Sequence, residues 1–420
     1  MKKIALLILL ICGASLGQMR PPVFRSPVMS EVIVSPANKQ VVLNYNYKIP
    51  YNKLIFEKNE NVFKSSFRIM LEVTDAKDNF VVRQSKEGDL AVKSFAETDS
   101  PFLFAEGTIS FSVDTGFFKI LPVFRDLKTP DELKLKEIEI HTTSFLSKNI
   151  LAPLIVESKK DSCNGQSLYA LANLSGNLPF NDNSYDFIMP VADTTINNIL
   201  VVAVNNEDTV FNGTLSKSFY LNNHITECGG KLLLDELNNG IVCKNFILSG
   251  ISSALNEGPL VFSISKDKKE KPKIFKTEVK WYAKPISLSD PEMAIQALKI
   301  VESDDTVKTM LNADKKDAYK VLFNYWKKHD PKPGSKYNPV MAEYYKRVDY
   351  AILNFSTMEK KNGALTDRGR IYVKYGQPVN IERTSNSDNK IVEIWSYINP
   401  KVKYYFVDKK GIGDFELMRQ

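Results

Sequence analysis

The stretch Gly363-Ala-Leu-Thr-Asp-Arg-Gly-Arg-Ile-Tyr-Val-Lys-Tyr-Gly-Gln-Pro378 lies where the hydrophobic period of the chain changes. Before it, apolar residues recur at three- and four-residue spacing, for instance over 341–355, which predicts helices. After it, runs rich in β-branched and aromatic residues alternate with turn residues, which predicts an antiparallel meander over 381–418. Because helices come first and antiparallel strands follow, we predict an α+β domain over 287–420. We expect its first strand already within the stretch, over 370–375.

The helices expected before this stretch have recognisable starts and apolar stripes. Ser289-Asp290-Pro291 is typical of a helix start, with a capping hydroxyl or carboxylate followed by a proline that the first turn tolerates. A second helix carries Trp326 on its apolar stripe. On a third helix, Glu343 and Arg347 stand four residues apart and are expected to pair.

Residues 39–286 contain many short strand-like runs separated by turn residues, with no helical period. Tyr45 and Tyr47, for example, alternate with polar residues, as expected for a strand that is buried on one face. Many short strands without helices predict β-sandwiches of the immunoglobulin-like kind. The pattern predicts one sandwich over 39–147 and a second over 148–286. The whole chain is therefore expected to be multidomain and mainly β.

The first residues are typical of a secretory signal peptide. Residues 1–17 contain two lysines, a short apolar run and small residues that end at Gly17, where we expect cleavage. Cys12 raises the alternative of a lipoprotein signal, but Ile11 stands where a small residue is expected, so we expect no lipid anchor. Residues 18–38 predict an extended segment. We therefore expect a periplasmic or extracellular protein without a transmembrane segment.

Composition argues against several classes of partner and cofactor. The formal net charge is +7, but lysines are mixed with acidic residues, as over 266–273. A nucleic-acid-binding face would need clustered basic residues with interleaved aromatics, so no nucleic-acid partner is expected. No histidine stands at ligand spacing from a cysteine pair, and no phosphate-binding glycine loop is present. We therefore expect no metal and no cofactor.

Three cysteines follow the predicted cleavage site: Cys163, Cys228 and Cys243. An oxidising compartment permits a disulfide. Cys228 and Cys243 flank a short glycine-containing stretch that is typical of a hairpin, so we predict that these two pair. Buried free thiols are the alternative, and Cys163 is left without an expected partner.

The charged residues of the opening stretch could serve packing or binding. Asp367 could cap a turn or pair with Arg368 or Arg370, while Gly369 and Gly376 permit backbone geometries that other residues avoid. We expect a buried ion-pair network that joins helix to sheet. The alternative is a site that binds a carboxylate, a phosphate or a sugar acid through the two arginines.

From Trp326 to its end the chain resembles the GWxTD domain, a family of uncharacterised bacterial envelope-associated modules named for a Gly-Trp-x-Thr-Asp motif. The resemblance implies a structural or ligand-contacting role for a set of recurrent positions. They are Trp326, Glu343, Arg347, Gly363, Thr366, Asp367, Arg368, Gly369, Arg370, Tyr372, Tyr375, Gly376 and Trp395. The sequence departs from the family pattern at Ala364, where the motif has its Trp, and at His329, where an Arg is familiar.

No hydrolase signature surrounds any of the three histidines, so we name no catalytic residue and expect a protein that is not an enzyme. We expect a structural or protein-interaction component of the cell envelope, whose partner is an envelope protein or a cell-wall component. A carbohydrate- or cell-wall-binding protein is one alternative and would display a row of exposed aromatic rings. A hydrolase is the other, and would bring together Asp367, Arg368, His329 and Glu343.

Overall fold

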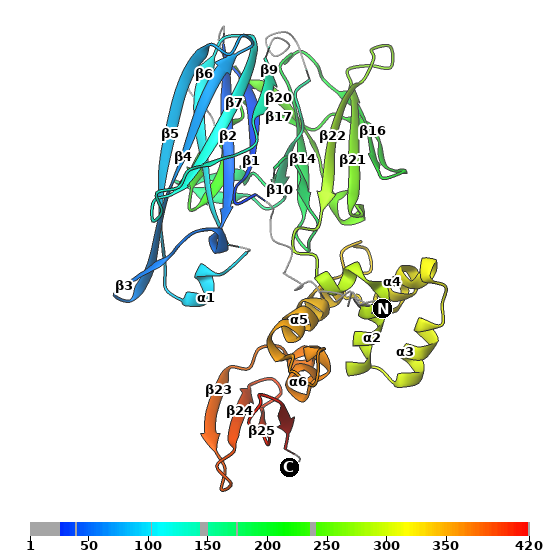
Figure 1. The fold of residues 1–420 in the computed structure, drawn as a ribbon. Coiled ribbons are helices and arrows are strands. Elements are labelled where there is room, and N and C mark those ends of the chain that lie inside the picture. The colour runs from blue at the N-terminus through cyan, green and yellow to red at the C-terminus, as the bar shows by residue number, and fades with distance from the viewer. Residues whose placement is uncertain are drawn as a thin grey trace, which may run out of the picture. The chain divides into compact units, whose positions relative to one another are not determined.

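The computed structural model describes residues 26–37, 40–101, 103–142, 150–173, 175–235 and 241–418 (Figure 1). The chain forms two compact units. The β unit runs to Tyr282 and includes Pro331–Pro339, and the C-terminal unit comprises Ala283–Asp330 with Val340–Gln420. The predicted signal peptide, Cys12 and most of the segment 18–38 lie outside the described residues.

The first part of the β unit consists of two antiparallel sheets around one core. Alternation explains this core: Tyr45 and Tyr47 of one sheet meet Phe67, Ile69 and Leu71 of the other, and all five are at most 2% exposed. The three-stranded sheet contains β1 (Met29–Pro36), β2 (Val41–Pro50) and β6 (Phe104–Val113). The six-stranded sheet contains β3 (Glu57–Asn59), β4 (Val62–Asp75), β5 (Phe80–Val92), β7 (Phe117–Asp126), β8 (Leu133–Lys134) and β9 (Ile138–His141). A short helix, α1 (Phe95–Thr98), follows β5.

The second part of the β unit has three sheets rather than the two of a simple sandwich. The central sheet contains β10 (Leu154–Glu157), β14 (Tyr185–Val191), β20 (Cys243–Leu248) and β17 (Ser218–Leu221). One flanking sheet contains β13 (Leu178–Pro179), β22 (Lys273–Lys280), β21 (Gly258–Ser265), β15 (Ile199–Asn205) and β16 (Asp208–Leu215). The smaller one contains β11 (Asp161–Cys163), β12 (Gln166–Ala170), β19 (Lys231–Asp235) and β18 (His224–Cys228). Because apolar clusters cover both faces of the central sheet, every residue of β14 is buried.

The C-terminal unit begins with helices and ends with an antiparallel meander. Its helices are α2 (Pro291–Ala297), α3 (Asp304–Leu311), α4 (Ala318–Lys327), α5 (Pro339–Phe355) and α6 (Asp367–Tyr375). Its strands pair in chain order: β23 (Asn380–Ser385), β24 (Ile391–Tyr397), β25 (Val402–Asp408) and β26 (Phe415–Leu417). Asp290 caps α2 as predicted, accepting hydrogen bonds from the backbone N–H groups of Glu292 and Met293.

The prediction of a mainly β chain that ends in helices followed by an antiparallel meander is confirmed. The immunoglobulin-like character of the sandwiches stays a prediction. The strand expected over 370–375 is wrong, because these residues lie in α6. Thr366 starts this helix by accepting a hydrogen bond from the N–H of Gly369 at 3.1 Å, and Gly369 and Val373, four residues apart, form its buried face.

Candidate functional site

The two glycines of the helix-to-sheet joint, Gly363 and Gly369, are sites of close backbone approach. A Cβ atom on Gly369 would lie 1.9 Å from the carbonyl oxygen of Gly363, and one on Gly363 would lie 2.2 Å from that of Ala351 in α5. Neither position admits a larger residue unless the backbone moves. The two glycines therefore allow α5, the turn at 363–365 and α6 to pack backbone against backbone.

The hydroxyl of Thr366 and the carboxylate of Asp367 fix the start of α6 through hydrogen bonds to the turn before it and to β26. The Thr366 hydroxyl donates to the Gly363 carbonyl at 2.7 Å and caps α6. The Asp367 carboxylate accepts a hydrogen bond from the N–H of Leu417 at 2.7 Å, which ties the first turn of α6 to β26. Asp367 thus contacts the last strand, and not Arg368 or Arg370 as the sequence suggested.

A buried ion pair links α6 to the sheet. Arg368, whose side chain is 13% exposed, contacts the carboxylate of Glu393 at 3.3 Å, and Glu393 is 3% exposed. Arg383 contacts the other oxygen of this carboxylate, Oε1, at 2.7 Å. The indole N–H of Trp395 donates to Oε2, the oxygen that Arg368 contacts, at 3.2 Å. The expected ion-pair network therefore exists around a different acid. Alternation along β24 could have identified Glu393, because it shares the inward face of the strand with Trp395.

The other arginine of the Arg-x-Arg pair turns away from this network. Arg370 is exposed and donates to the carbonyl of Leu365 at 3.2 Å. Arg368 donates to the Gly413 carbonyl at 3.2 Å and packs over the rings of Phe355 and Phe415. The two guanidinium groups thus have separate protein partners and do not form a joint anion clamp.

Aromatic rings fill the space between α5, α6 and the sheet. Tyr372 stacks on Tyr350 with ring centroids 4.3 Å apart and packs edge-on against Phe355 and Trp395. Burial, with the neighbouring Tyr350 as a lesser cause, raises the pKa of Tyr372 to about 12. This ring accordingly remains protonated near neutral pH.

The C-terminal end of α6 is fixed by its last tyrosine, by the following glycine and by α5. Tyr375 stacks on Tyr404 of β25 at 5.5 Å. Gly376 adopts a positive φ of 80° and accepts a hydrogen bond from the Tyr397 hydroxyl at 3.0 Å. Arg347 bonds Glu343 at 2.8 Å, as the spacing suggested, and also reaches the carbonyl of Lys374 at 3.4 Å.

Trp326 lies among the other helices and not at the joint. Its indole N–H donates to the hydroxyl of Tyr345 at 3.2 Å, and that hydroxyl donates to the carbonyl of Ala294 at 3.0 Å. These bonds connect α2, α4 and α5. His329 packs beside the rings of Tyr325 and Trp326.

The four residues that a hydrolase would have brought together have different partners. Asp367 accepts a hydrogen bond from the N–H of Leu417, and Arg368 forms an ion pair with Glu393. Glu343 forms an ion pair with Arg347, and His329 packs against aromatic rings. Within the described ranges, no cluster of three or more His, Cys, Asp or Glu side chains could hold a metal ion. These four side chains are thus engaged separately within the C-terminal unit.

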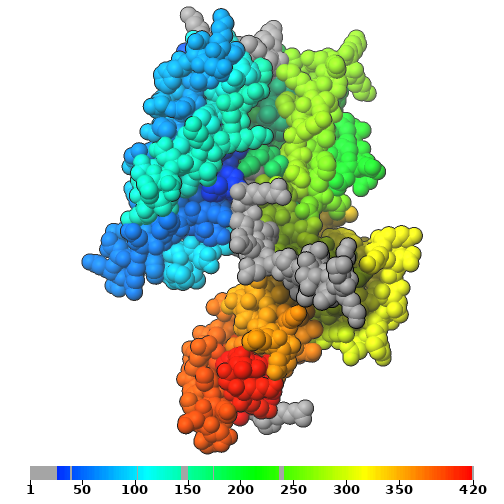
Figure 2. Space-filling view, in the orientation of Figure 1, coloured from blue at the N-terminus to red at the C-terminus, as the bar shows by residue number. Residues whose placement is uncertain are grey.

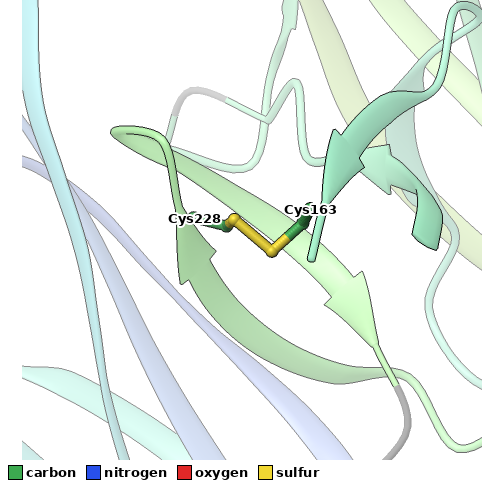
Figure 3. The surroundings of a disulfide bond; sticks show 2 residues. All are labelled: Cys163 and Cys228. Carbon is green, nitrogen blue, oxygen red and sulfur yellow. A yellow bond between two sulfur atoms is a disulfide. The ribbon is translucent and has the colours of Figure 1, made fainter. Parts of the chain in front are cut away.

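The predicted pairing of Cys228 with Cys243 is wrong, because Cys228 forms a disulfide with Cys163 (Figure 3). Their Cα atoms lie 6.1 Å apart, and the bond joins β11 and β18, the two edge strands of the smaller flanking sheet. The glycine turn after Cys228 closes the hairpin β18–β19, and the chain then leaves for the central sheet. There Cys243 is a fully buried free thiol whose pKa burial raises to about 11.

A carbohydrate-binding protein would display a row of exposed aromatic rings. The most exposed rings of the described residues do not form such a row. They belong to separate elements and are Phe80, Phe95, Tyr220, Tyr319 and Tyr350. In the part of the chain that the structure describes, no helix is both long and apolar enough to cross a bilayer.

Residues 261–420 match the model of the GWxTD domain family. The protein therefore contains a GWxTD domain. Ala364, at the position of the motif tryptophan, is fully buried beside Gly369, so the motif ring position of this GWxTD domain belongs to the core. The match begins within β21, earlier than the resemblance suggested. No curated protein matches the chain.

Proposed function

We propose that the protein is an exported bacterial envelope protein, cleaved near Gly17, that serves as a structural or protein-interaction component through its GWxTD domain. The observation that carries this proposal is the strand β23. All six of its residues are exposed, and within the described residues it pairs with β24 alone. An edge strand offers unpaired backbone N–H and C=O groups to another chain.

The side chains beside this edge support contact with a protein. Val379 is 62% exposed and Ile381 is 50% exposed. Arg383 already contacts the carboxylate of Glu393, at 2.7 Å. A partner strand could therefore add to β23 through main-chain hydrogen bonds while its apolar side chains meet Val379 and Ile381.

The engagement of the motif residues supports a structural role over catalysis. Thr366, Asp367 and Arg368 all bind groups within their own unit, and Gly363 and Gly369 meet backbone. The disulfide between Cys163 and Cys228 supports export, because such bonds persist mainly in oxidising compartments.

Site-specific photo-crosslinking tests the interaction. A photoreactive residue at Ile381 in the full chain is expected to capture a discrete envelope partner in cells. Ile274, which is 51% exposed on β22, provides a matched control position. The added change Ser385→Pro should remove the product, because it removes an N–H that points away from β24 and so disrupts strand addition. Equal products from both positions, or a product that survives Ser385→Pro, would contradict the role of β23.

Cell fractionation tests export. The mature chain is expected in the periplasmic or extracellular fraction with Gln18 as its first residue, as read by mass spectrometry of the N-terminal peptide. An intact N-terminus in the cytoplasmic fraction would refute export. Sedimentation with purified cell wall, without a protein crosslink at Ile381, would favour the cell-wall-binding alternative.

A further inference from the structure

Strand β1 belongs to both parts of the β unit. Its side chains Val32 and Val34 pack against the core of the first part. Ile33, on the opposite face, packs against the apolar cluster between the central sheet and the smaller flanking sheet. The hydroxyl of Ser35 donates to the carbonyl of Asn223 at 3.1 Å. Figure 1 shows β1 beside β10 and β14, and Figure 2 shows dark-blue residues of this strand at the seam between the cyan and green parts.

A cavity of about 280 Å³ lies along this second face of β1. Its walls are mainly apolar and include Ile33, Leu151, Pro153, Phe262 and Phe275. Small-molecule sites in proteins have this character, with apolar walls and a few fixed polar groups.

Asn223 lines the cavity and holds an unsatisfied acceptor that is enclosed within its wall. The residue is 3% exposed, and its side-chain oxygen Oδ1 has no hydrogen-bond partner. Its amide nitrogen is engaged, donating to the Oδ1 of Asn245 at 2.8 Å. A buried acceptor without a partner costs about 1 to 3 kcal/mol, but this oxygen has almost no accessible surface and is not within direct reach of a molecule in the cavity.

Glu31 contributes a second acceptor. Its carboxylate accepts a hydrogen bond from the amide of Asn173 at 3.3 Å, which leaves further lone pairs on its oxygens. Lys48, whose charge acts on Glu31, is already bonded to Glu106 at 2.9 Å, and Lys276 also lines the cavity. Burial raises the pKa of Glu31 to about 7, against the opposing effects of Asn173, Lys48 and the Gly176 backbone. The carboxylate would therefore gain from a cation in the cavity.

The spacing of these acceptors indicates the shape of the ligand. Glu31 and Ser35, which contacts Asn223, stand four residues apart on one strand, which corresponds to about 13 Å. The apolar walls lie between them. The cavity therefore suits an elongated apolar body with a hydrogen-bond donor at one end.

We propose that this cavity binds an elongated aliphatic amine, whose ammonium group donates to Glu31 and whose chain lies against Ile33 and Phe275. This site lies in the β unit and does not depend on the proposed role of β23.

Calorimetric titration of the full chain with three eight-carbon probes tests this proposal. Octylamine, octan-1-ol and octanoate share one chain length and differ only in the head group. At pH 8 we expect octylamine to bind most tightly, octan-1-ol about ten-fold more weakly, and octanoate not at all, because the carboxylate of Glu31 attracts an ammonium group and repels a second carboxylate. Octanoate binding as tightly as octylamine would overturn the proposal, and so would a titration in which no probe saturates, which would indicate a cavity that holds water alone.

Two pairs of variants locate the binding. Ala152→Trp fills the cavity from an exposed position and should abolish octylamine binding, whereas Ala76→Trp, exposed in a distant turn, should leave it unchanged. Glu31→Gln should weaken octylamine about ten-fold and octan-1-ol much less, because it removes the charge and keeps the shape. Glu278→Gln, on the outer face of β22, is its control. Octylamine binding unaffected by both Ala152→Trp and Glu31→Gln would place the amine elsewhere and refute the assignment.

Discussion

The stretch 363–376 of the C-terminal unit and strand β1 of the β unit each join two packed parts, but the two joints differ in how completely they are packed. In the C-terminal unit, Gly363 and Gly369 meet backbone to backbone and Arg368 is bonded to the buried Glu393. In the β unit, β1 joins two packed parts and leaves a cavity of about 280 Å³ with an unpaired oxygen on Asn223. The closed joint is dense in glycines and charges, whereas the open joint is an ordinary alternating strand. Special residues therefore mark the place where the backbone must close tightly, and give no signal for the hollow one.

The largest expected effect comes from the disulfide of the sheet that backs the open joint. Apolar residues of this sheet, Ile225, Leu232 and Leu234, lie in the cluster that Ile33 contacts. Cys163→Ser should destabilise the β unit by about 4 kcal/mol, because the bond closes a loop with a sequence separation of 65. Hydrogen exchange read by mass spectrometry should show lost protection in the β unit and not in the C-terminal unit.

Cys243→Ala is the matched control for this change. It removes a buried thiol without breaking a disulfide and should cost about 1 kcal/mol. If it costs as much as Cys163→Ser, the assigned pairing does not hold the sheet.

The closed joint should not tolerate a single added methyl group. Helix propensity alone would make Gly369→Ala stabilising by about 1 kcal/mol, but the new Cβ would meet the Gly363 carbonyl. We expect a net loss of about 3 kcal/mol in urea unfolding. Gly334→Ala, where a Cβ would have nothing within 4 Å, should change stability by less than about 0.5 kcal/mol. A stabilised Gly369→Ala variant would show that the joint is not tightly packed.

The contribution of each arginine that contacts Glu393 to stability should depend on how deeply that arginine is buried. Arg368→Met should cost about 2 kcal/mol, because Glu393 stays buried and retains only its bonds to Arg383 and Trp395. Arg383→Met removes a side chain that is 71% exposed and should cost about 0.5 kcal/mol. Thermal unfolding of the two variants side by side measures the difference, and equal melting temperatures would argue against a buried pair.

The smallest expected effect is a pH dependence at the open joint. The pKa of Glu31 is raised from 4.5 to about 7, so the folded protein binds its proton more tightly than the unfolded chain. This contribution to stability is complete below about pH 4.5 and is lost as the pH rises through about 7. Glu31→Gln should therefore gain stability relative to the parent as the pH rises from 5 to 8. Parallel stability curves for the two proteins would contradict this.

Local patterns predicted much of the fold. Period-two alternation identified β2, β4, β24 and β25, and helical spacing identified α4 and α5 together with the cap of α2. α6 was misread because Ile371, Tyr372 and Val373 favour strands, and a capping threonine with a close glycine contact outweighed that preference. The pairing of Cys228 was misread because a local hairpin suggested a partner nearby, while the smaller sheet brings in a residue 65 positions away.

By itself the sequence determined the kinds of most elements, though not of α6, and the family of the C-terminal domain, because these depend on the spacing of residues along the chain. Only the tertiary structure decided that Arg368 bonds Glu393, that Cys228 bonds Cys163, and that Glu31 and Asn223 border one cavity. The physical reason is that each of these contacts joins residues from different strands or helices. Their proximity depends on how whole sheets pack, which no short window of sequence specifies.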